Sequence, residues 1–178
     1  MKKNTNINEL EPLPPQSEID EIVTAVEEKA RAGNLKAQLG CAQTFKDRLI
    51  VPQDIHKARR YYQMAAEQDD PEAQFLYGKF LLGIVNDDQF HQPFEWVYKS
   101  AINGYLEAQA MLSYFYQYGH GVEQSYEKAT YWTRIAAENG LVSAQTTLGQ
   151  NYIWCELEKK DFPKAVYWLQ KATDQGDQ

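Results

Sequence analysis

The stretch 108–143, AQAMLSYFYQYGHGVEQSYEKATYWTRIAAENGLVS, reads as two short helices joined by a glycine loop. In its first half, apolar residues recur every four positions, which places them on one face of a helix: Ala108, Leu112 and Tyr116. Gly119 and Gly121 then provide a turn in which a side chain would be strained. The second half repeats the helical spacing, and Gly140 stands where a helix usually stops. The stretch therefore predicts a helical hairpin.

The same pattern can be laid along most of the chain. Its opening Ala-Gln pair recurs at intervals of 35 or 36 residues, beginning at Ala37, Ala73, Ala108 and Ala144. The helix stop recurs at a similar interval, at Gly33, Asp69, Gly104, Gly140 and Gly176. One hairpin cannot bury its own apolar face, so a fixed period of this size predicts an all-α solenoid of stacked hairpins. We expect four repeats, over residues 37–72, 73–107, 108–143 and 144–178.

A further helix is expected before the first repeat. Residues 18–32 carry an apolar stripe behind Ser17, a residue type that often caps a helix, and we interpret this segment as a cap over the first repeat. Residues 1–16 contain three prolines and are expected to be extended or disordered. Residues 17–178 are then expected to form a single domain.

The repeat has a recognisable consensus. The pattern A-x-x-x-L-G-x-x-Y-x-x-G-x-G-V, followed by K-A-x-x-W-x-x-x-A-A-x-x-G, resembles the Sel-one-like repeat, a relative of the tetratricopeptide repeat. The third copy departs from it only at Ser113, where the family usually has glycine. The second copy is the most degenerate, with Pro93 where later copies have alanine. The resemblance covers residues 37–176 and implies an α/α-solenoid that binds other proteins and catalyses no reaction.

The composition suggests the kind of partner. The 178-residue chain is 43% hydrophobic and 13% aromatic, as expected for a folded domain, and its net charge is −7. Nucleic acids and anionic membranes select basic surfaces, so neither is expected as the main partner. A protein partner with a basic contact surface fits better.

The N-terminus and the two cysteines favour a cytoplasmic location. No apolar run follows the first lysines, so a signal peptide is not expected, and no stretch has the roughly 20 apolar residues of a membrane span. Cys41 and Cys155 lie in the first and fourth repeats. Stacked repeats should hold them too far apart for a disulfide, which favours a reducing compartment.

Little in the sequence supports catalysis. The chain contains no zinc-ligand spacing, phosphate-binding loop or nucleophile motif, so we predict no catalytic residues, no metal and no cofactor. Cys41 takes the leucine position of its repeat and is expected in the core. A thiol-dependent enzyme that uses Cys155 remains a distant alternative.

The repeat register also predicts a binding face. Positions 3, 6, 7 and 10 residues after each repeat's alanine are expected on the far side of the first helix, which the resemblance places on the concave surface. These positions are apolar or aromatic mainly in the middle of the solenoid. The candidate partner-binding residues are Leu76, Phe80, Met111, Tyr114, Phe115, Tyr118 and Trp154. The alternative is that some of these rings pack against neighbouring helices.

Two roles suit such a module. The first is an adaptor or scaffold that brings proteins together, which we take as the principal hypothesis. The second is an intracellular inhibitor, such as an immunity protein that neutralises a bacterial toxin, because toxins that act on nucleic acid are often basic. The oligomeric state cannot be predicted from the sequence.

Overall fold

The computed structural model describes residues 14–48, 50–86, 89–154 and 160–176, and every regular element within these ranges is a helix. The prediction of an all-α fold is confirmed. The helices are α1 (Gln16–Arg31), α2 (Leu35–Lys46), α3 (Ile55–Ala66), α4 (Pro71–Leu82), α5 (His91–Ile102), α6 (Leu106–Tyr118), α7 (Tyr126–Glu138), α8 (Val142–Trp154) and α9 (Phe162–Gly176).

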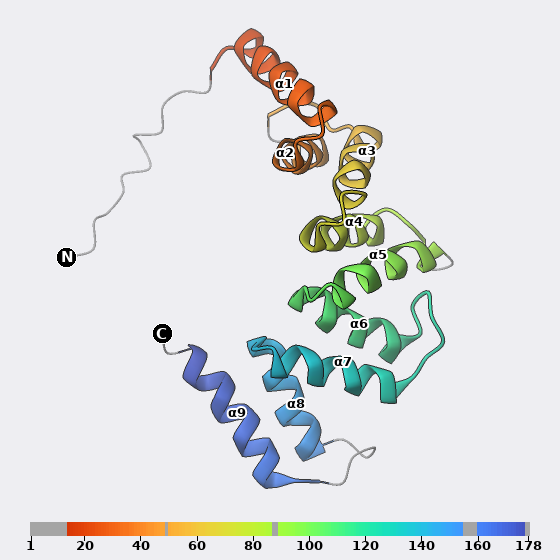
Figure 1. Ribbon diagram of the computed structural model, residues 1–178, viewed down its shortest axis with the longest axis vertical. Coiled ribbons are helices and arrows are strands. Elements are labelled where there is room, and N and C mark those ends of the chain that lie inside the picture. Colours follow the sequence, from red (N-terminus) through yellow and green to blue (C-terminus); the bar gives the residue numbers. More distant parts are fainter. Residues whose placement is uncertain (1–13, 49, 87–88, 155–159, 177–178) are drawn as a thin grey trace, which may run out of the picture.

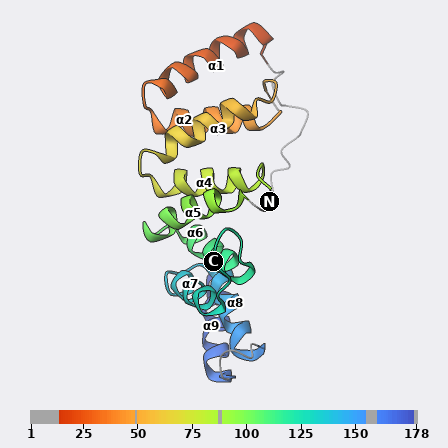
Figure 2. The ribbon, with the colours of Figure 1, turned by 90° about the vertical axis from the view of Figure 1, so that its right-hand side faces the viewer.

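The helices form a curved stack of hairpins. After α1, they pair as α2–α3, α4–α5, α6–α7 and α8–α9, and each hairpin packs on the next in chain order. The stack bends into an arc, with α2 and α4 on its inner side and α3 and α5 on its outer side (Figure 1). A view turned by 90° shows the succession from α1 at one end to α9 at the other (Figure 2). We call α2, α4, α6 and α8 the first helices, and α3, α5, α7 and α9 the second helices.

The repeated Ala-Gln pair has a structural reason. In the third repeat, the Nε2 of buried Gln109 donates to the carbonyl oxygen of Ala101 at the end of α5, at 3.3 Å. Its Oε1 accepts from Asn139 Nδ2 at the end of α7, at 3.2 Å. Gln38 and Gln145 make the equivalent bonds in their repeats. Gln109 and Gln145 therefore each link two successive second helices, and Gln38 links α1 to the end of α3. The bonded carbonyls also accept from the backbone N–H groups of Gly33, Gly104 and Gly140, so each glutamine adds a second hydrogen bond where a helix ends.

The predicted helix stops are confirmed at four of five positions. Gly33, Gly104 and Gly140 follow helices with φ of +92°, +90° and +100°, and Asp69 takes the same place with φ of +59°. These left-handed conformations end a helix by turning the backbone away from the helical path. Gly176 is the exception, because α9 extends to that residue.

The glycine loop after α6 is held against the preceding hairpin. Gly119 ends α6 in the left-handed conformation, with φ of +71°. Gly121 also has a positive φ, and a Cβ atom there would collide with the carbonyl of Phe90, just before α5. The loop can approach this backbone only because Gly121 has no side chain. His120, between the two glycines, packs edge-on against the Phe90 ring at 4.9 Å between centroids.

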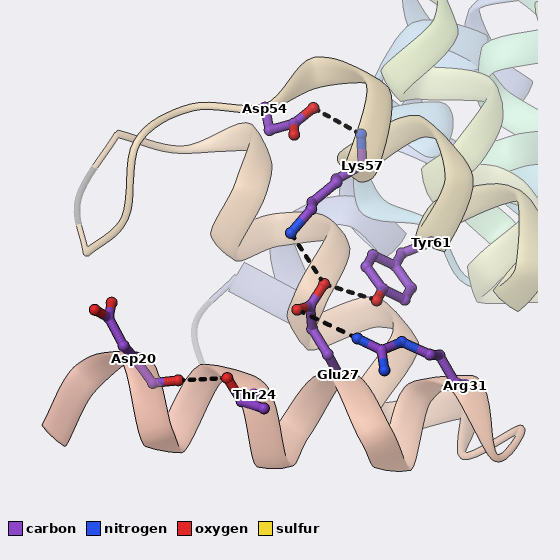
Figure 3. A network of polar contacts seen from close by, with 7 residues as sticks. All are labelled: Asp20, Thr24, Glu27, Arg31, Asp54, Lys57 and Tyr61. Carbon is purple, nitrogen blue, oxygen red and sulfur yellow. Dashed lines mark hydrogen bonds and ion pairs between the residues drawn. The ribbon is translucent and has the colours of Figure 1, made fainter. Parts of the chain in front are cut away.

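Helix α1 is joined to the first repeat by a buried carboxylate (Figure 3). Glu27 accepts a hydrogen bond of 2.8 Å from the Tyr61 hydroxyl of α3, and it pairs with Lys57 of α3 at 3.4 Å and with Arg31 at 3.6 Å. The Lys57 ammonium also lies 4.4 Å from the centre of the Phe45 ring. A buried carboxylate with three partners requires α1 and α3 to keep one relative position.

The N-terminal region differs from its expectation at the start of α1. Helix α1 begins at Gln16, before Ser17, and its start has no side-chain cap, so the predicted Ser17 cap is wrong. The segment expected to be extended falls mainly on residues 1–13, which lie outside the described residues. In the part of the chain that the structure describes, no helix has the length and hydrophobicity needed to cross a bilayer.

Candidate protein-binding site

Three of the seven predicted binding residues have exposed side chains. Tyr114 and Tyr118 of α6 are 51% and 55% exposed, and Trp154 at the end of α8 is 77% exposed. Leu76 and Met111 are half-buried and pack partly against core clusters. These five side chains therefore offer some surface to a partner, most of it aromatic.

Phe80 and Phe115 are core residues, which corrects our expectation for them. Phe115 is fully buried and meets Phe94 of α5 at 5.6 Å between ring centroids. Phe80 is buried against Tyr62 of α3, at 5.0 Å. Both rings stand seven residues after the repeat's alanine. With 3.6 residues per turn, seven residues make almost two full turns, so this position returns to the alanine's own buried side.

The exposed tyrosines form part of an aromatic cluster on α6 and the loop that follows it. The ring centroids of Tyr114 and Tyr118 are 4.7 Å apart. His120 joins them, with its ring 5.3 Å from Tyr114 and 5.9 Å from Tyr118. We name Tyr114, Tyr118 and His120 the aromatic cluster. The repeat register does not single out His120, although the glycines on both sides of it indicate a loop that folds back.

The other predicted residues lie at separate places along the first helices. Leu76 and Phe80 line a cleft of about 510 Å³ between the first and second repeats, together with Gln43, Tyr62 and Lys79. Burial raises the pKa of Tyr62 to about 12, with a smaller contribution from the negative charge of Asp47. The hydroxyl of Tyr62 therefore stays protonated at neutral pH. Neither this cleft nor the aromatic cluster includes Trp154.

Cys41 is poorly suited to nucleophilic chemistry. It is 3% exposed, as predicted for a core residue, and burial followed by the charge of Glu27 raises the pKa of its thiol. A protonated, buried thiol is a poor nucleophile. Cys155 lies outside the described residues. Among those described, no three histidine, cysteine, aspartate or glutamate side chains gather as a metal site would require, and the absence of metals and cofactors stays a prediction.

Several solved structures share this fold. A Sel1 repeat protein from Oxalobacter formigenes is 26% identical, with a TM-score of 0.76 over 89% of this chain and 65% of that one. The protective antigen c5321 of uropathogenic Escherichia coli, which has an SLR fold, is 29% identical, with a TM-score of 0.78 over 86% of this chain. The present chain spans 65% of the first protein's length and 33% of the second's.

More distant structures share the fold alone. The immunity protein Pa5087 from Pseudomonas aeruginosa is 23% identical, with a TM-score of 0.55 over 95% of this chain and 69% of that one. The immunity protein PA5088 from the same organism is 21% identical, with a TM-score of 0.57 and coverage of 95% and 68%. A comparison with curated protein sequences gives no match.

The family model of the Sel1 repeat matches residues 35–70, 106–141 and 143–177, which is more than half of the chain. Among the four repeats, the unmatched one is the second, where the sequence is most degenerate, yet α4 and α5 form a hairpin there as well. Sel1 repeats generally serve as non-catalytic modules for protein–protein interaction. The three matches and the shared solenoid show that this chain belongs to the Sel1 repeat family.

Proposed function

We propose that this protein binds a protein partner on the inner surface formed by its first helices, and that it acts as an adaptor or scaffold. The observation that carries the proposal is the aromatic cluster. Tyr114 and Tyr118 are each about half exposed although they lie on a first helix in the middle of the stack. Large exposed rings that gather in one place are typical of protein-binding surfaces.

The cluster is also ordered before any partner arrives. The two tyrosine rings contact each other and His120, whose ring is in turn packed against Phe90. Rings that are already in contact lose little conformational freedom on binding, so more of the buried area contributes to affinity. Met111, one turn before Tyr114 on α6, and Leu76 of α4 in the preceding repeat are half-buried and extend the apolar part of the surface.

Affinity capture tests this proposal. The tagged protein and a variant with Tyr114→Ala and Tyr118→Ala would be used to capture partners from a lysate of the source organism. We expect a partner that is retained by the unaltered protein and reduced at least tenfold by the double variant. Tyr131→Ala is the matched control, because Tyr131 is 55% exposed on a second helix. Equal retention by all three proteins would move the binding site away from the aromatic cluster.

A second candidate function is inhibition of a basic toxin. The observation that favours it is the net charge of −7 on a chain with a sequence pI of about 5.0, which would steer a basic partner toward the solenoid. The likeness to immunity proteins shows the fold only. A single equimolar partner that is toxic when expressed alone, and harmless when coexpressed with this chain, would establish the inhibitor. Several partners in smaller amounts would favour the adaptor.

The remaining features of the proposed function stay predictions. A basic contact surface on the partner, the lack of binding to nucleic acid or membranes, and a cytoplasmic location all follow from sequence composition. Binding assays with nucleic acid and with anionic vesicles would test the predicted lack of binding to either. They would be run at low salt, where electrostatic binding is strongest.

A further inference from the structure

An apolar pocket of about 240 Å³ lies between α1 and α2, beside the loop that leads to α3. Among the described residues that line it, Thr44 has the only hydroxyl group, and none is charged. Cys41 and Phe45 of α2 form part of its buried wall. Two other lining side chains, Ile22 and Ile50, are 54% and 52% exposed. We call this the α1–α2 pocket.

The pocket exists because α2 carries small side chains where later first helices carry large ones. Cys41 stands four residues after the repeat's alanine, where α4 has Tyr77. Thr44 stands seven residues after it, where α4 has Phe80 and α6 has Phe115. All three of these rings are buried in their own repeats. The small side chains of α2 therefore leave open a space that aromatic rings occupy elsewhere in the solenoid.

The next junction along the solenoid shows which group suits this space. There Phe80 of α4 packs against Tyr62 of α3, with ring centroids 5.0 Å apart. The residues 36 positions earlier are Thr44 and Val26, and both line the α1–α2 pocket. A pair of rings at the second junction is thus replaced by two small side chains at the first. Because a cavity of about 150 Å³ is enough to bind benzene, the pocket has room for one aromatic ring.

The lining favours an aromatic occupant over an aliphatic or a charged one. The ring of Phe45 lines the pocket, and two aromatic rings in edge or offset contact gain more than their buried area alone provides. The polarizable sulfur of Cys41 also lines the pocket and favours contact with a ring. A charged group would meet no partner of opposite sign in the lining, and burying an unpaired charge is costly.

The surface beside the pocket is acidic. The first two turns of α1 carry three exposed carboxylates and no basic residue. Residues 46–48, at the end of α2, add two basic groups and one acidic group, so acidic groups prevail around the pocket. Basic residues on either side of a bound ring would therefore be attracted to this surface. The three carboxylates are those of Glu18, Asp20 and Glu21.

We propose that the α1–α2 pocket receives an aromatic side chain of the bound protein, flanked there by basic residues. The inference rests on the proposed function, because the ring belongs to the partner held by the first helices. Thr44 lies in the last turn of α2, as Tyr118 does in α6, so the pocket and the aromatic cluster lie at the same ends of their first helices. The chain's own N-terminus is a poorer occupant, because residues 1–13 contain no aromatic residue.

The test uses acetyl-Lys-Phe-Lys-amide as the probe, with the amide signals of the full chain followed by NMR. We expect saturable shifts in α1 and α2, with a dissociation constant on the order of 1 mM for a ligand of this size. Leucine in place of phenylalanine should weaken binding by about three- to tenfold, because the contacts between rings are lost. Glutamate in place of both lysines should also weaken binding, and added salt should reduce that difference.

Two variants fill the pocket from within. Thr44→Phe copies Phe80 onto α2, and Val26→Tyr copies Tyr62 onto α1. Both should abolish binding of the probe, and urea denaturation should show Thr44→Phe to be at least as stable as the unaltered chain, because it fills a cavity. Thr24→Phe is the matched control, because it adds the same ring at an exposed residue of α1 that does not line the pocket. It should bind the probe normally.

Several results would overturn the proposal. These are equal binding of the leucine or the acidic probe, an absence of saturable shifts, and shifts that survive both filling variants in spectra that show a folded chain. Binding only after removal of residues 1–13 would assign the pocket to the chain's own N-terminus. Shifts of the same signals with protein concentration alone would assign it to a second copy. The assay does not involve Tyr114 or Tyr118, so its failure is distinguishable from failure of the proposed function, which the capture experiment tests.

Discussion

Helix α6 has two aromatic faces that the sequence alone does not separate. Phe115 and Tyr116 are buried, at 0% and 7% exposure, whereas Tyr114 and Tyr118 are more than half exposed. The buried pair meets Phe94 of the preceding hairpin. The exposed pair meets only its own helix and loop among the ring contacts of the described residues. The same residue types thus serve the core on one side and a binding surface on the other.

This difference shows how little of a first helix is free in a solenoid. Each first helix packs on its own second helix and also on the second helix of the preceding hairpin. In α6, Ala108, Leu112 and Phe115 belong to one core cluster that includes residues of α5, and Trp132 of α7 packs against this cluster. Only a narrow stripe remains, and Tyr114 and Tyr118, one turn apart, lie along it.

The largest expected effect comes from the buried face. Phe115→Ala would remove a fully buried ring from a core cluster that also contains Leu112 and Val97. We expect the free energy of unfolding to fall by about 3–5 kcal/mol. Urea denaturation followed by circular dichroism would measure it. Tyr114→Ala, the matched change on the exposed face, should alter stability by no more than about 0.5 kcal/mol. Similar losses for both variants would contradict the division of α6 into two faces.

A smaller effect is expected where Ser113 replaces the consensus glycine. Gly78→Ser would push a Cβ atom to within 2.8 Å of Val97 and 3.1 Å of the Pro93 carbonyl. The backbone cannot move aside easily, so we expect a loss of about 1–3 kcal/mol in the free energy of unfolding. In the third repeat, the hydroxyl oxygens of Ser113 and Thr133 are 2.7 Å apart and share a hydrogen bond. Adding Val97→Thr to Gly78→Ser reproduces this pair and should restore part of the loss. A neutral Gly78→Ser variant would show that this junction has room to spare.

The smallest effect concerns the buried phenol of α6. Burial raises the pKa of Tyr116 above the ordinary value of about 10, and the electrostatic interaction with Tyr98 adds a smaller increase. A pKa that is higher in the folded state gives stability below pH 10 that is lost as the pH rises further. Tyr116→Phe should therefore leave stability at neutral pH nearly unchanged and reduce the loss at about pH 11. Urea midpoints at the two pH values would measure it, and an unchanged alkaline loss would contradict the prediction.

The repeat and the fold could be predicted from the sequence because the residues that recur in each repeat serve the backbone. In three of the four Ala-Gln pairs the glutamine bonds a backbone carbonyl of the preceding helix, and Gly33, Gly104 and Gly140 adopt conformations that most other residues avoid. Because the backbone needs these residues in every repeat, they recur at the repeat interval even where the surface residues vary. The degenerate second repeat also folds as a hairpin, and its Gln74 keeps the bond to Asn103 at the end of α5.

The candidate site could be predicted only in part. Tyr114 and Tyr118 follow from the register, but Phe80 and Phe115 were misplaced because two helical turns return a residue to its starting side. His120 joins the cluster through a loop contact with Phe90, which no periodic pattern encodes. The hydrogen bond between Ser113 of α6 and Thr133 of α7 also follows from no periodic pattern. The departure from the consensus at Ser113 signals an unusual contact, but its partner is visible only in the structure.

The central claim is that the partner contacts the inner face of the first helices. Tyr118 and Tyr131 are both 55% exposed, one on first helix α6 and the other on second helix α7, so they form a matched pair for site-specific photocrosslinking. A photoreactive phenylalanine analogue would replace each tyrosine in turn in the source organism. We predict a covalent adduct with a protein partner from position 118 and none from position 131. An adduct from position 131 alone would contradict the account and place the binding surface on the second helices.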